Sequence, residues 1–576
     1  MSEELVTTSG TPMAVAITGS GGSGAVTAGM ILLEAVGEAG WFGLMTRSAG
    51  PQIRGGESAA MLRFGPEPVE CLGDRFDLLV GLDWRNAGRF ADEIPLDAAS
   101  LVLTDSGAGP VPQALLRCGP QVYELPLRAA AEAVPQGRLN MVAIGTLGTR
   151  VGLPLAALEG GLRRTLGGKG AKVVEPALAC LRQGFDLGWA PFAMAAVSAP
   201  GAPERWVLSG NDAAGLGALR GGVRFVAAYP ITPATEILEW LAPRLEQLGG
   251  SLLQAEDEVA SVNMIIGAAF GGVPALTATS GPGLSLMMEG IGLAVASETP
   301  IVVVDVMRGG PSTGIPTKPE QSDLNIAVYG LHGDAPHLVL APLSVGDCAF
   351  TTQWAVGLAE HLQTAAIVLS DQSLGQSRAV TAPAPEPTAH LTRLRQTSPG
   401  ERYQRYALTE YGVSPMTEPG IPGGMYTAEG LEHTERGTPS SAAADHRVQL
   451  EKRRIKLDDF DYGDAWAEIR GEGETCVLTW GSTAGAVFEA AERARAAGTP
   501  LRVIALRLLA PLRRRALMRA LEGARRLLVV EQNQSGQLFH LLNAHRVLPP
   551  TARRFARPGP LPLRPGEILE HILGTD

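Results

Sequence analysis

Four polar clusters in the middle of the chain carry the residue types that bind anions and move protons. Each follows a short apolar run and precedes a helix-like segment; they are YPITPAT at residues 229–235, EDE at 256–258, TSGPGLS at 279–285 and RGGPSTGIPT at 308–317. The apolar runs before them predict strands of a parallel sheet at residues 224–228, 251–255, 274–279 and 300–307. Ligands bind at the carboxyl ends of such strands, so the four clusters predict one site.

Three side chains of these clusters suit chemistry, and each has a plainer alternative. Thr232 precedes Pro233, which predicts a helix N-cap where an anionic group is favoured, although capping alone also explains the pair. Glu258 adjoins an apolar helical run at residues 259–270, so it is either a buried carboxyl that handles a proton or part of a solvated helix start. Arg308 ends a buried strand and needs an anionic partner, either a substrate carboxylate or a structural salt bridge.

A glycine-rich turn, GSGGSG at residues 19–24, joins a predicted strand at 14–18 to a helix. Backbone N–H groups at such a turn can face a phosphate. An NAD site would need an acidic residue about 20 positions later, and the strand at 42–45 leads into no acid. Arg47 and Arg54 instead suit a phosphorylated ribose, as in NADP or the ADP end of coenzyme A. The alternative is a turn that only packs the helix against the strand.

Composition and charge exclude several classes of protein. The 576 residues predict three or four domains, and 45% hydrophobic against 19% charged residues exclude a disordered chain. The net charge is −11 and no basic tract stands out, so no nucleic-acid partner is expected. The five cysteines lie far apart, which excludes a Cys-x-x-Cys zinc site and favours a reducing compartment. With neither a signal sequence nor an apolar run of membrane length, we expect a cytoplasmic protein with no membrane partner.

Strand and helix patterns alternate along nearly the whole chain, which predicts an α/β fold with several parallel-sheet domains. We predict domains at residues 1–195, 206–380 and 465–576, with a linker rich in Pro, Ala and Gly at 199–203. Residues 381–464 are predicted to be an irregular extension between the last two domains.

The four polar clusters, in the order in which they follow one another along the chain, resemble those of the α subunit of 2-oxoacid:ferredoxin oxidoreductases with a γ domain fused in front. The resemblance is strongest to the 2-oxoglutarate type. The resemblance covers nearly the whole chain, and YPITP at 229–233 is its most specific motif. Further matching motifs are TSGPG at 279–283, RGGPST at 308–313, the helix of Glu258, GVSP at 412–415, PG at 419–420, EH at 432–433, EQNQSGQ at 531–537, the glycine turn at 19–24 and RGGES at 54–58.

The resemblance implies an enzyme that uses thiamine diphosphate. It would interconvert 2-oxoglutarate, coenzyme A and oxidised ferredoxin with succinyl-CoA, CO2 and reduced ferredoxin. The resemblance also implies a γ-like domain at 1–195, a pyrimidine-binding-type domain at 206–380 and a transketolase C-terminal-like domain at 465–576. The catalytic residues would be Glu258, which would bond to the aminopyrimidine ring, and Thr232 and Arg308, which would hold the 2-oxoacid carboxylate. Further contacts are implied for Pro230 and Ile231 with thiamine diphosphate, for Thr313 with the substrate, and for Arg47, Arg54 and Gly55 with coenzyme A.

One motif of thiamine enzymes is missing from the sequence. No Gly-Asp-Gly diphosphate–metal motif is present, and the cysteine spacing suits no Fe–S cluster, so no metal ligand is assigned to this chain. The resemblance implies a separate β subunit that brings Mg2+, the diphosphate contacts and a [4Fe–4S] cluster. We therefore expect an (αβ)2 complex that passes electrons to ferredoxin, and no activity of the chain alone.

Three alternatives remain open from the sequence. The substrate could be pyruvate or another 2-oxoacid, because no residue is identified as setting specificity. The chain could be a non-catalytic assembly or regulatory protein of the same fold, although the intact Thr232, Glu258 and Arg308 argue against this. The glycine turn at 19–24 leaves an NADP-dependent oxidoreductase as the third alternative.

Overall fold

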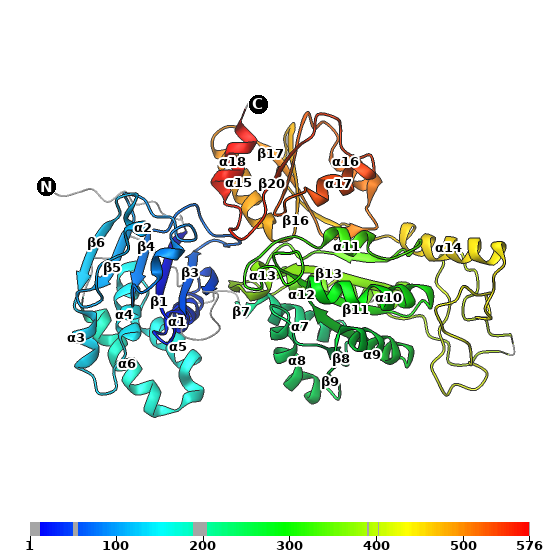
Figure 1. Cartoon of the computed structure of the whole chain (residues 1–576), viewed down its shortest axis with the longest axis horizontal. Coiled ribbons are helices and arrows are strands. Elements are labelled where there is room, and N and C mark those ends of the chain that lie inside the picture. Colours follow the sequence, from blue (N-terminus) through cyan, green and yellow to red (C-terminus); the bar gives the residue numbers. More distant parts are fainter. Residues whose placement is uncertain (1–11, 50–55, 188–203, 389–390, 401, 575–576) are drawn as a thin grey trace. The chain divides into compact units, whose positions relative to one another are not determined.

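The computed structural model of the chain describes residues 12–49, 56–187, 204–388, 391–400 and 402–574, which form an α/β protein of two compact units (Figure 1). Unit 1 comprises Met1–Ser209, Gln376–Pro383 and Arg564–Gly566, and unit 2 comprises Gly210–Gly375, Ala384–Leu563 and Glu567–Asp576. The predicted linker at residues 199–203 lies outside the described residues. All five cysteines are free.

Unit 1 is built on an eight-stranded sheet in the order β6-β5-β4-β1-β3-β2-β14-β7. The bounds are β1 (Met13–Ser20), β2 (Phe42–Ala49), β3 (Glu57–Gly65), β4 (Leu78–Gly81), β5 (Leu101–Asp105), β6 (Gln121–Leu125), β7 (Trp206–Ser209) and β14 (Arg378–Thr381). β1, β4, β5 and β6 are parallel neighbours, whereas β3, β2, β14 and β7 each pair antiparallel, so this sheet is mixed. The strands predicted at 14–18 and 42–45 are confirmed as β1 and β2.

Alternation along β1 divides the core of unit 1 between the two faces of its sheet. Val15 and Ile17 belong to a cluster with the helices, and Ala14 and Ala16 belong to a second cluster that contains Trp84. This period of two is what a strand buried on both faces requires. The helices of unit 1 are α1 (Ala25–Glu38), α2 (Gln113–Leu116), α3 (Leu127–Glu132), α4 (Leu139–Val151), α5 (Leu155–Leu166) and α6 (Ala171–Asp186), with short 3-10 turns at η1 (Ala87–Phe90) and η2 (Gly167–Lys169).

Unit 2 contains a seven-stranded sheet in the order β18-β12-β13-β11-β10-β8-β9. Its strands are β8 (Phe225–Ala228), β9 (Ser251–Gln254), β10 (Ala275–Thr279), β11 (Ile301–Met307), β12 (Leu338–Leu340), β13 (Ala365–Asp371) and β18 (Leu508–Ala510). All are parallel except β18. The four strands predicted before the polar clusters are confirmed as β8, β9, β10 and β11.

A helix follows nearly every strand of this sheet, as parallel connections require. The helices are α7 (Gly210–Arg220), α8 (Thr235–Gln247), α9 (Glu258–Phe270), α10 (Gly281–Ala296), α11 (Leu324–Tyr329), α12 (Asp347–Leu362) and α13 (Gln372–Gln376). All seven side chains of β11 are buried, which explains its continuous apolar sequence. Among the described residues, none of the helices has the length and apolar character that crossing a membrane demands.

The C-terminal part of unit 2 has its own five-stranded sheet in the order β15-β17-β16-β19-β20, parallel except for β15. The apolar run at residues 476–480 forms most of β16. The elements are β15 (Ala467–Arg470), β16 (Thr475–Trp480), η3 (Gly481–Thr483), α15 (Ala484–Ala496), β17 (Leu501–Leu506), α16 (Arg514–Ala520), β19 (Arg526–Glu531), α17 (Gln537–Ala544), β20 (Arg553–Ala556) and α18 (Pro565–Leu573).

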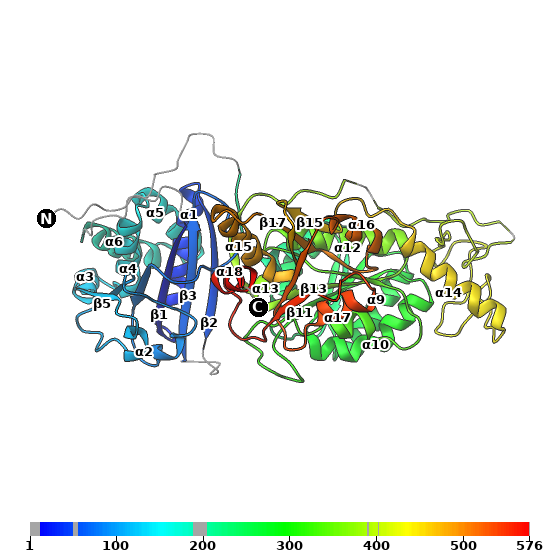
Figure 2. The same ribbon diagram turned by 90° about the horizontal axis from the view of Figure 1, so that it is seen from above.

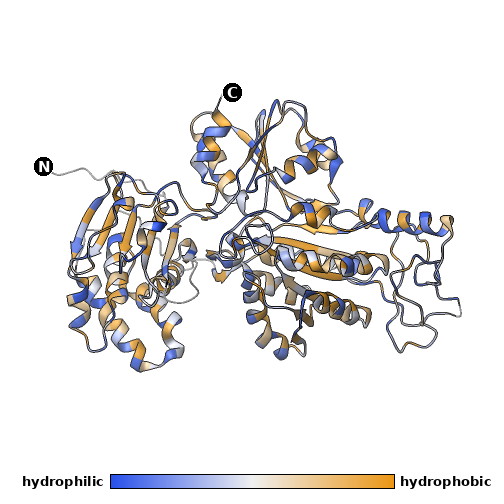
Figure 3. Ribbon diagram, viewed as in Figure 1, coloured by the Kyte–Doolittle hydropathy of each residue, from blue (hydrophilic) through white to orange (hydrophobic). Residues whose placement is uncertain are grey.

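The extension after β14 contains a helix that the sequence analysis missed. The described residues between 382 and 442 form neither helix nor strand, but α14 (Ala443–Asp458) follows them, and the two lie side by side (Figures 1 and 2). Figure 3 shows α14 mostly in the hydrophilic colour. Because α14 has no apolar stripe, the usual periodic signal of an amphipathic helix is absent from its sequence.

Buried charges rather than apolar side chains attach α14 to the sheet domain. Lys452 Nζ donates to both carboxylate oxygens of Glu298 at 2.6 and 2.7 Å, and Lys456 Nζ donates to Glu298 Oε2 at 3.0 Å. Arg405, in the extension, donates to the Glu298 carbonyl at 2.8 Å. Although burial acts in the opposite direction, the two ammonium groups hold the pKa of Glu298 well below its ordinary value. Burial lowers the pKa of Lys456 to about 7.

Glu298→Gln should detach the extension from the seven-stranded sheet domain of unit 2. Two buried ammonium groups would lose their counter-charge, and breaking a buried ion pair in this way costs about 3–5 kcal/mol. Urea denaturation of the full chain and protease cleavage between residues 402 and 442 would measure the loss. The matched control is Glu451→Gln, which removes an exposed carboxylate that pairs with Arg454 on α14 and should change neither readout. Equal stability of the two variants would contradict the structural role of Glu298.

Candidate functional site

The parallel sheet of unit 2 brings the four polar clusters to one edge. β11, β10, β8 and β9 are consecutive neighbours, and all four run in the same direction. Thr279, at the end of β10, is in register with Asp305 of β11, and Ala228 of β8 is in register with Gln254 of β9. The clusters begin at these strand ends, so residues up to 88 positions apart in the chain, from 229 to 317, line one region.

Glu258 is the buried carboxyl of this region. It opens α9, whose N-cap residue Asp257 accepts a hydrogen bond from the backbone N–H of Ala260 at 2.7 Å. Glu256 is exposed, whereas Glu258 is only 6% exposed. No described residue donates a hydrogen bond to the Glu258 carboxylate. A buried carboxylate without a donor is costly unless a ligand supplies one.

Gly283 makes room for this carboxyl group. A Cβ atom on Gly283 would lie 2.6 Å from Glu258 Oε1 and 2.1 Å from Thr279 Oγ1. The first turn of α10 can therefore pack against Glu258 only because residue 283 has no side chain. The TSGPG motif thus acts on the carboxyl through close packing.

Arg308 links the end of β11 to the cluster that follows β8. Its Nη1 donates to the carbonyl of Thr232 at 2.6 Å. The prediction that Thr232 caps the helix is wrong, because α8 begins at Thr235 with Ala234 at the N-cap position. The Ile231 carbonyl accepts the first turn's N–H groups, so the Thr232 carbonyl is left for Arg308. No salt bridge to Arg308 is present among the described residues.

The loop after Arg308 folds back on itself. Ile315 N–H donates to the Gly309 carbonyl at 2.8 Å, and Gly309 N–H donates to the Lys318 carbonyl at 3.1 Å. Gly314 has φ +56°, and a Cβ there would lie 1.7 Å from the Gly309 oxygen, so only glycine fits. Thr313 is exposed on this loop. In the cluster after β8, Pro230 and Ile231 are half-buried and the Thr232 side chain is exposed.

Two acidic residues beside Arg308 were missed by the sequence analysis. Asp305 lies inside β11 and is fully buried, and Asp323 follows the loop. Burial, reinforced by the charge of Asp323, raises the pKa of Asp305 well above its ordinary value. Burial also raises the pKa of Asp323 to about 6. An aspartate within an otherwise apolar strand, VVVDVM at 302–307, was the signal that could have identified Asp305.

Gln321 connects this edge to the five-stranded sheet. Its Nε2 donates to the Trp480 carbonyl at 2.8 Å, and its Oε1 accepts from the Gln532 N–H at 2.7 Å. Asn533 Nδ2 donates to the Gln321 carbonyl at 3.2 Å. The EQNQSGQ motif at 531–537 therefore positions the loop that carries Asp323. The partners of Gln321 lie more than 150 positions away in the chain, so no local sequence pattern could have indicated these contacts.

Only one of the three residues predicted to contact coenzyme A lies within the described part of unit 1. Arg47 is exposed on β2, whereas Arg54 and Gly55 lie outside the described residues. The glycine turn follows β1 and opens α1, as predicted, and Ser20 within it donates to Asp83 at 2.8 Å. The residues that the structure describes include no group of three or more His, Cys, Asp or Glu placed to hold a metal ion.

Three protein-family descriptions match the chain. "Pyruvate flavodoxin/ferredoxin oxidoreductase, thiamine diP-bdg" matches residues 216–453, and "Pyruvate ferredoxin/flavodoxin oxidoreductase" matches residues 14–187. "Transketolase, C-terminal domain" matches residues 464–550. The region around Glu258 and Arg308 thus falls within the first of these matches.

Curated relatives and a solved structure agree with these matches. The 2-oxoglutarate synthase subunit KorA of Methanothermobacter marburgensis is 38% identical over 381 residues, which cover 64% of this chain and 99% of the relative. The protein of the same name from Archaeoglobus fulgidus is 38% identical over 58% of this chain and 90% of its own length. A 2-oxoglutarate:ferredoxin oxidoreductase from Magnetococcus marinus, solved with 2-oxoglutarate, coenzyme A and succinyl-CoA bound, superposes with a TM-score of 0.90 at 35% identity, over 98% of this chain and 99% of that chain.

Gly283→Ala should displace the Glu258 carboxyl and destabilise unit 2. The added methyl group overlaps Thr279 Oγ1 and Glu258 Oε1, and overpacking of this kind costs about 1–3 kcal/mol. The matched control is Gly292→Ala on the same helix, where nothing lies within 4 Å of the new Cβ. That change should stabilise the chain by about 0.5–1 kcal/mol, the usual helix preference for Ala over Gly. Thermal denaturation of both variants measures the difference, and an equal response would contradict the close packing.

Proposed function

Because the chain belongs to the 2-oxoacid:ferredoxin oxidoreductase family and is related to 2-oxoglutarate synthase subunit KorA, we propose that it is the α subunit of a 2-oxoglutarate:ferredoxin oxidoreductase. The complete enzyme would interconvert 2-oxoglutarate, coenzyme A and oxidised ferredoxin with succinyl-CoA, CO2 and reduced ferredoxin. The observation that carries the proposal is the buried, donor-free Glu258 at the same sheet edge as Arg308.

The residues around Glu258 fit thiamine diphosphate. The Glu258 carboxylate lacks a donor within the described chain and is almost fully buried, so a ligand with polar ring nitrogens would satisfy it. Pro230 and Ile231, half-buried at the end of β8, would contact the same ring. When bound, thiamine diphosphate supplies the electron sink that loss of CO2 from a 2-oxoacid requires.

The chain's own residues would bind the substrate and hold a proton. Glu258, which is almost fully buried, would exchange a proton with the ring nitrogen of the bound cofactor. Arg308 would bind the 2-oxoacid carboxylate, since a guanidinium matches a carboxylate in charge and shape. Its hydrogen bond to the Thr232 carbonyl holds it in place, and the exposed hydroxyls of Thr232 and Thr313 would add polar contacts.

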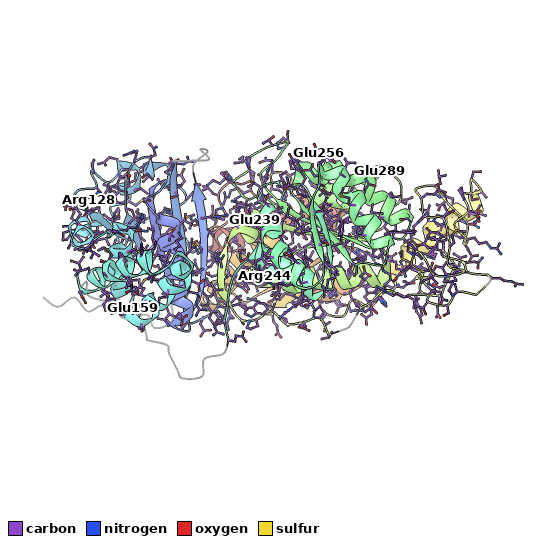
Figure 4. The ribbon with its side chains drawn as sticks, turned by 90° about the horizontal axis from the view of Figure 1, so that it is seen from below. Arg128, Glu159, Glu239, Arg244, Glu256 and Glu289 are labelled. Atoms are coloured by element: carbon purple, nitrogen blue, oxygen red, sulfur yellow. The ribbon has the colours of Figure 1, made fainter. Side chains whose placement is uncertain are left out.

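A partner β subunit would complete the site with Mg2+, the diphosphate contacts and a [4Fe–4S] cluster. The helices beside Glu258 present a face that suits such a partner. Val259 and Met264 on α9 are 46% and 39% exposed, and Leu286 on α10 is 55% exposed. Figure 4 labels Glu289 on α10 and, two residues before α9 begins, Glu256. We propose an (αβ)2 assembly with ferredoxin as electron acceptor.

Coenzyme A would bind to unit 1, through the predicted contacts of Arg47, Arg54 and Gly55. Cationic side chains suit the phosphates of its ADP end.

The proposal also includes the predicted domain boundaries. These are a γ-like domain at 1–195, a pyrimidine-binding-type domain at 206–380, the extension at 381–464 and a transketolase C-terminal-like domain at 465–576. We place the enzyme in the cytoplasm, where unpaired cysteines are the rule.

The proposal is tested by reconstituting the chain with a β subunit and assaying electron transfer from 2-oxoglutarate and from pyruvate to ferredoxin. We expect 2-oxoglutarate to be the better substrate and the chain alone to be inactive. Glu258→Gln should lower kcat by at least about 100-fold, because a positioned proton-transfer group contributes that much or more. The matched control is Glu256→Gln, which changes an exposed carboxylate two positions earlier and should leave kcat unaltered.

Two outcomes of this assay would contradict parts of the proposal. A preference for pyruvate would keep the enzyme class but overturn the substrate. Full activity of the Glu258→Gln complex would overturn the catalytic role and leave a non-catalytic assembly protein as the better interpretation.

Leu286→Glu should prevent the chain from co-purifying with its β subunit. A side chain that is buried at an interface contributes about 1.5–3 kcal/mol, and a carboxylate there would add a desolvation cost. Leu248, at the end of α8, is a matched control because it is 49% exposed and Leu248→Glu should not affect co-purification. Size-exclusion chromatography of the tagged chain measures both variants. Retention of the β subunit by the Leu286→Glu chain would show that this face is not the interface.

A further inference from the structure

Two carboxyl groups lie beside Arg308, and the function proposed above does not use them. Asp305 lies three residues before Arg308 on β11, and Asp323 begins the segment that leads into α11. Asp305 has no exposed surface, and Asp323 Oδ2 is likewise buried. Both carboxyl groups act electrostatically on Arg308.

The surrounding chain provides almost no donors for these two groups. Apart from each other, Asp305 Oδ1, Asp305 Oδ2 and Asp323 Oδ2 have no hydrogen-bond partner among the described residues. Asp323 Oδ1 accepts from the Ser322 hydroxyl at 3.1 Å. Gly281 leaves the space for Asp323, since a Cβ there would lie 2.7 Å from Oδ2. Two contacting carboxyls that are buried without donors cannot both be ionised.

We propose that Asp305 and Asp323 share one proton, and that this pair sets the charge with which Arg308 meets the 2-oxoacid carboxylate. Asp305 is then the proton-holding member, which donates to the ionised Asp323. With one proton, the pair carries a single negative charge that balances Arg308. With none, a second negative charge faces the incoming substrate anion. Asp305 is a positioning residue in this scheme, and the proposal rests on the proposed role of Arg308.

The pKa directions agree with this order of protonation. Burial, with the charge of Asp323 added, raises the pKa of Asp305, and the hydrogen bond from Asp305 offsets part of the rise that burial gives to the pKa of Asp323. Asp323 is therefore the group that ionises first as pH rises. The proton on Asp305 is lost only at higher pH, so binding of the substrate anion should weaken toward alkaline pH.

Other charged groups near the pair are few. From the loop, Glu320 faces Asp323, and burial raises the pKa of Glu320 as well. On the neighbouring strand β13, Asp371 is in register with Met307 and accepts from the Ser482 hydroxyl. On β10 and at the start of α10, Thr279, Ser280 and Gly281 carry no titrating group. Arg308 is the cation that acts on both members of the pair.

The test measures KM for 2-oxoglutarate in the reconstituted complex from neutral pH toward alkaline pH. The wild-type KM should rise roughly tenfold or more, the effect of one added charge at close range. Asp305→Asn keeps the shape and a donor but cannot ionise, so its KM should match wild type at neutral pH and stay constant. Asp323→Asn leaves a single acid in the pair and should also abolish the rise in KM. This second variant keeps the test decisive if Asp305→Asn does not fold. Asp371→Asn is the control and should keep the wild-type profile.

Infrared spectroscopy gives a readout that does not depend on activity. At neutral pH, the difference spectrum between the wild-type and Asp305→Asn complexes should contain the C=O band of one protonated, buried carboxyl group. A KM that still rises with pH in both pair variants, or a difference spectrum without this band, would overturn the shared proton. A wild-type complex that oxidises no 2-oxoacid would instead overturn the proposed function, and the infrared band would still decide the protonation of the pair.

Discussion

The parallel register of β8, β9, β10 and β11 is the constraint on which the site depends. Parallel strands present their carboxyl ends at one edge, so clusters that are scattered over residues 229–317 lie together although they are not neighbours in the sequence. Within this register, the pairing of Thr279 with Asp305 matters most for the site. It places the first turn of α10, which packs against Glu258, next to β11, the strand that Arg308 directly follows.

Close packing and missing side chains do much of the positioning at this edge. Gly283 admits Glu258, Gly281 admits Asp323, and Gly314 lets the loop after Arg308 close on itself. In each case a methyl group would collide with a functional side chain or with backbone. The glycines of these motifs therefore shape the site without making polar contacts of their own.

Buried polar groups in this chain fall into two kinds. Gln321 and Glu298 have a full set of partners and hold segments together, the first across two sheets and the second under α14. Glu258 is 6% exposed and Asp305 is fully buried, and neither carboxyl group receives a hydrogen bond from an N–H donor of the described chain. Since an unsatisfied buried carboxyl is costly, its persistence marks the place where a ligand or a proton is handled.

The sequence by itself determined the α/β class, the four strands that carry the polar clusters, and the candidacy of Glu258 and Arg308, because period and composition are local signals. It missed α14, whose charged surface has no apolar stripe, and it misplaced Thr232 at a helix cap. Only the tertiary structure decided which groups meet: Arg308 with the Thr232 carbonyl, Asp305 with Asp323, and Gln321 with the C-terminal sheet. These contacts join residues far apart in the chain, and their energies depend on burial, which no local pattern records.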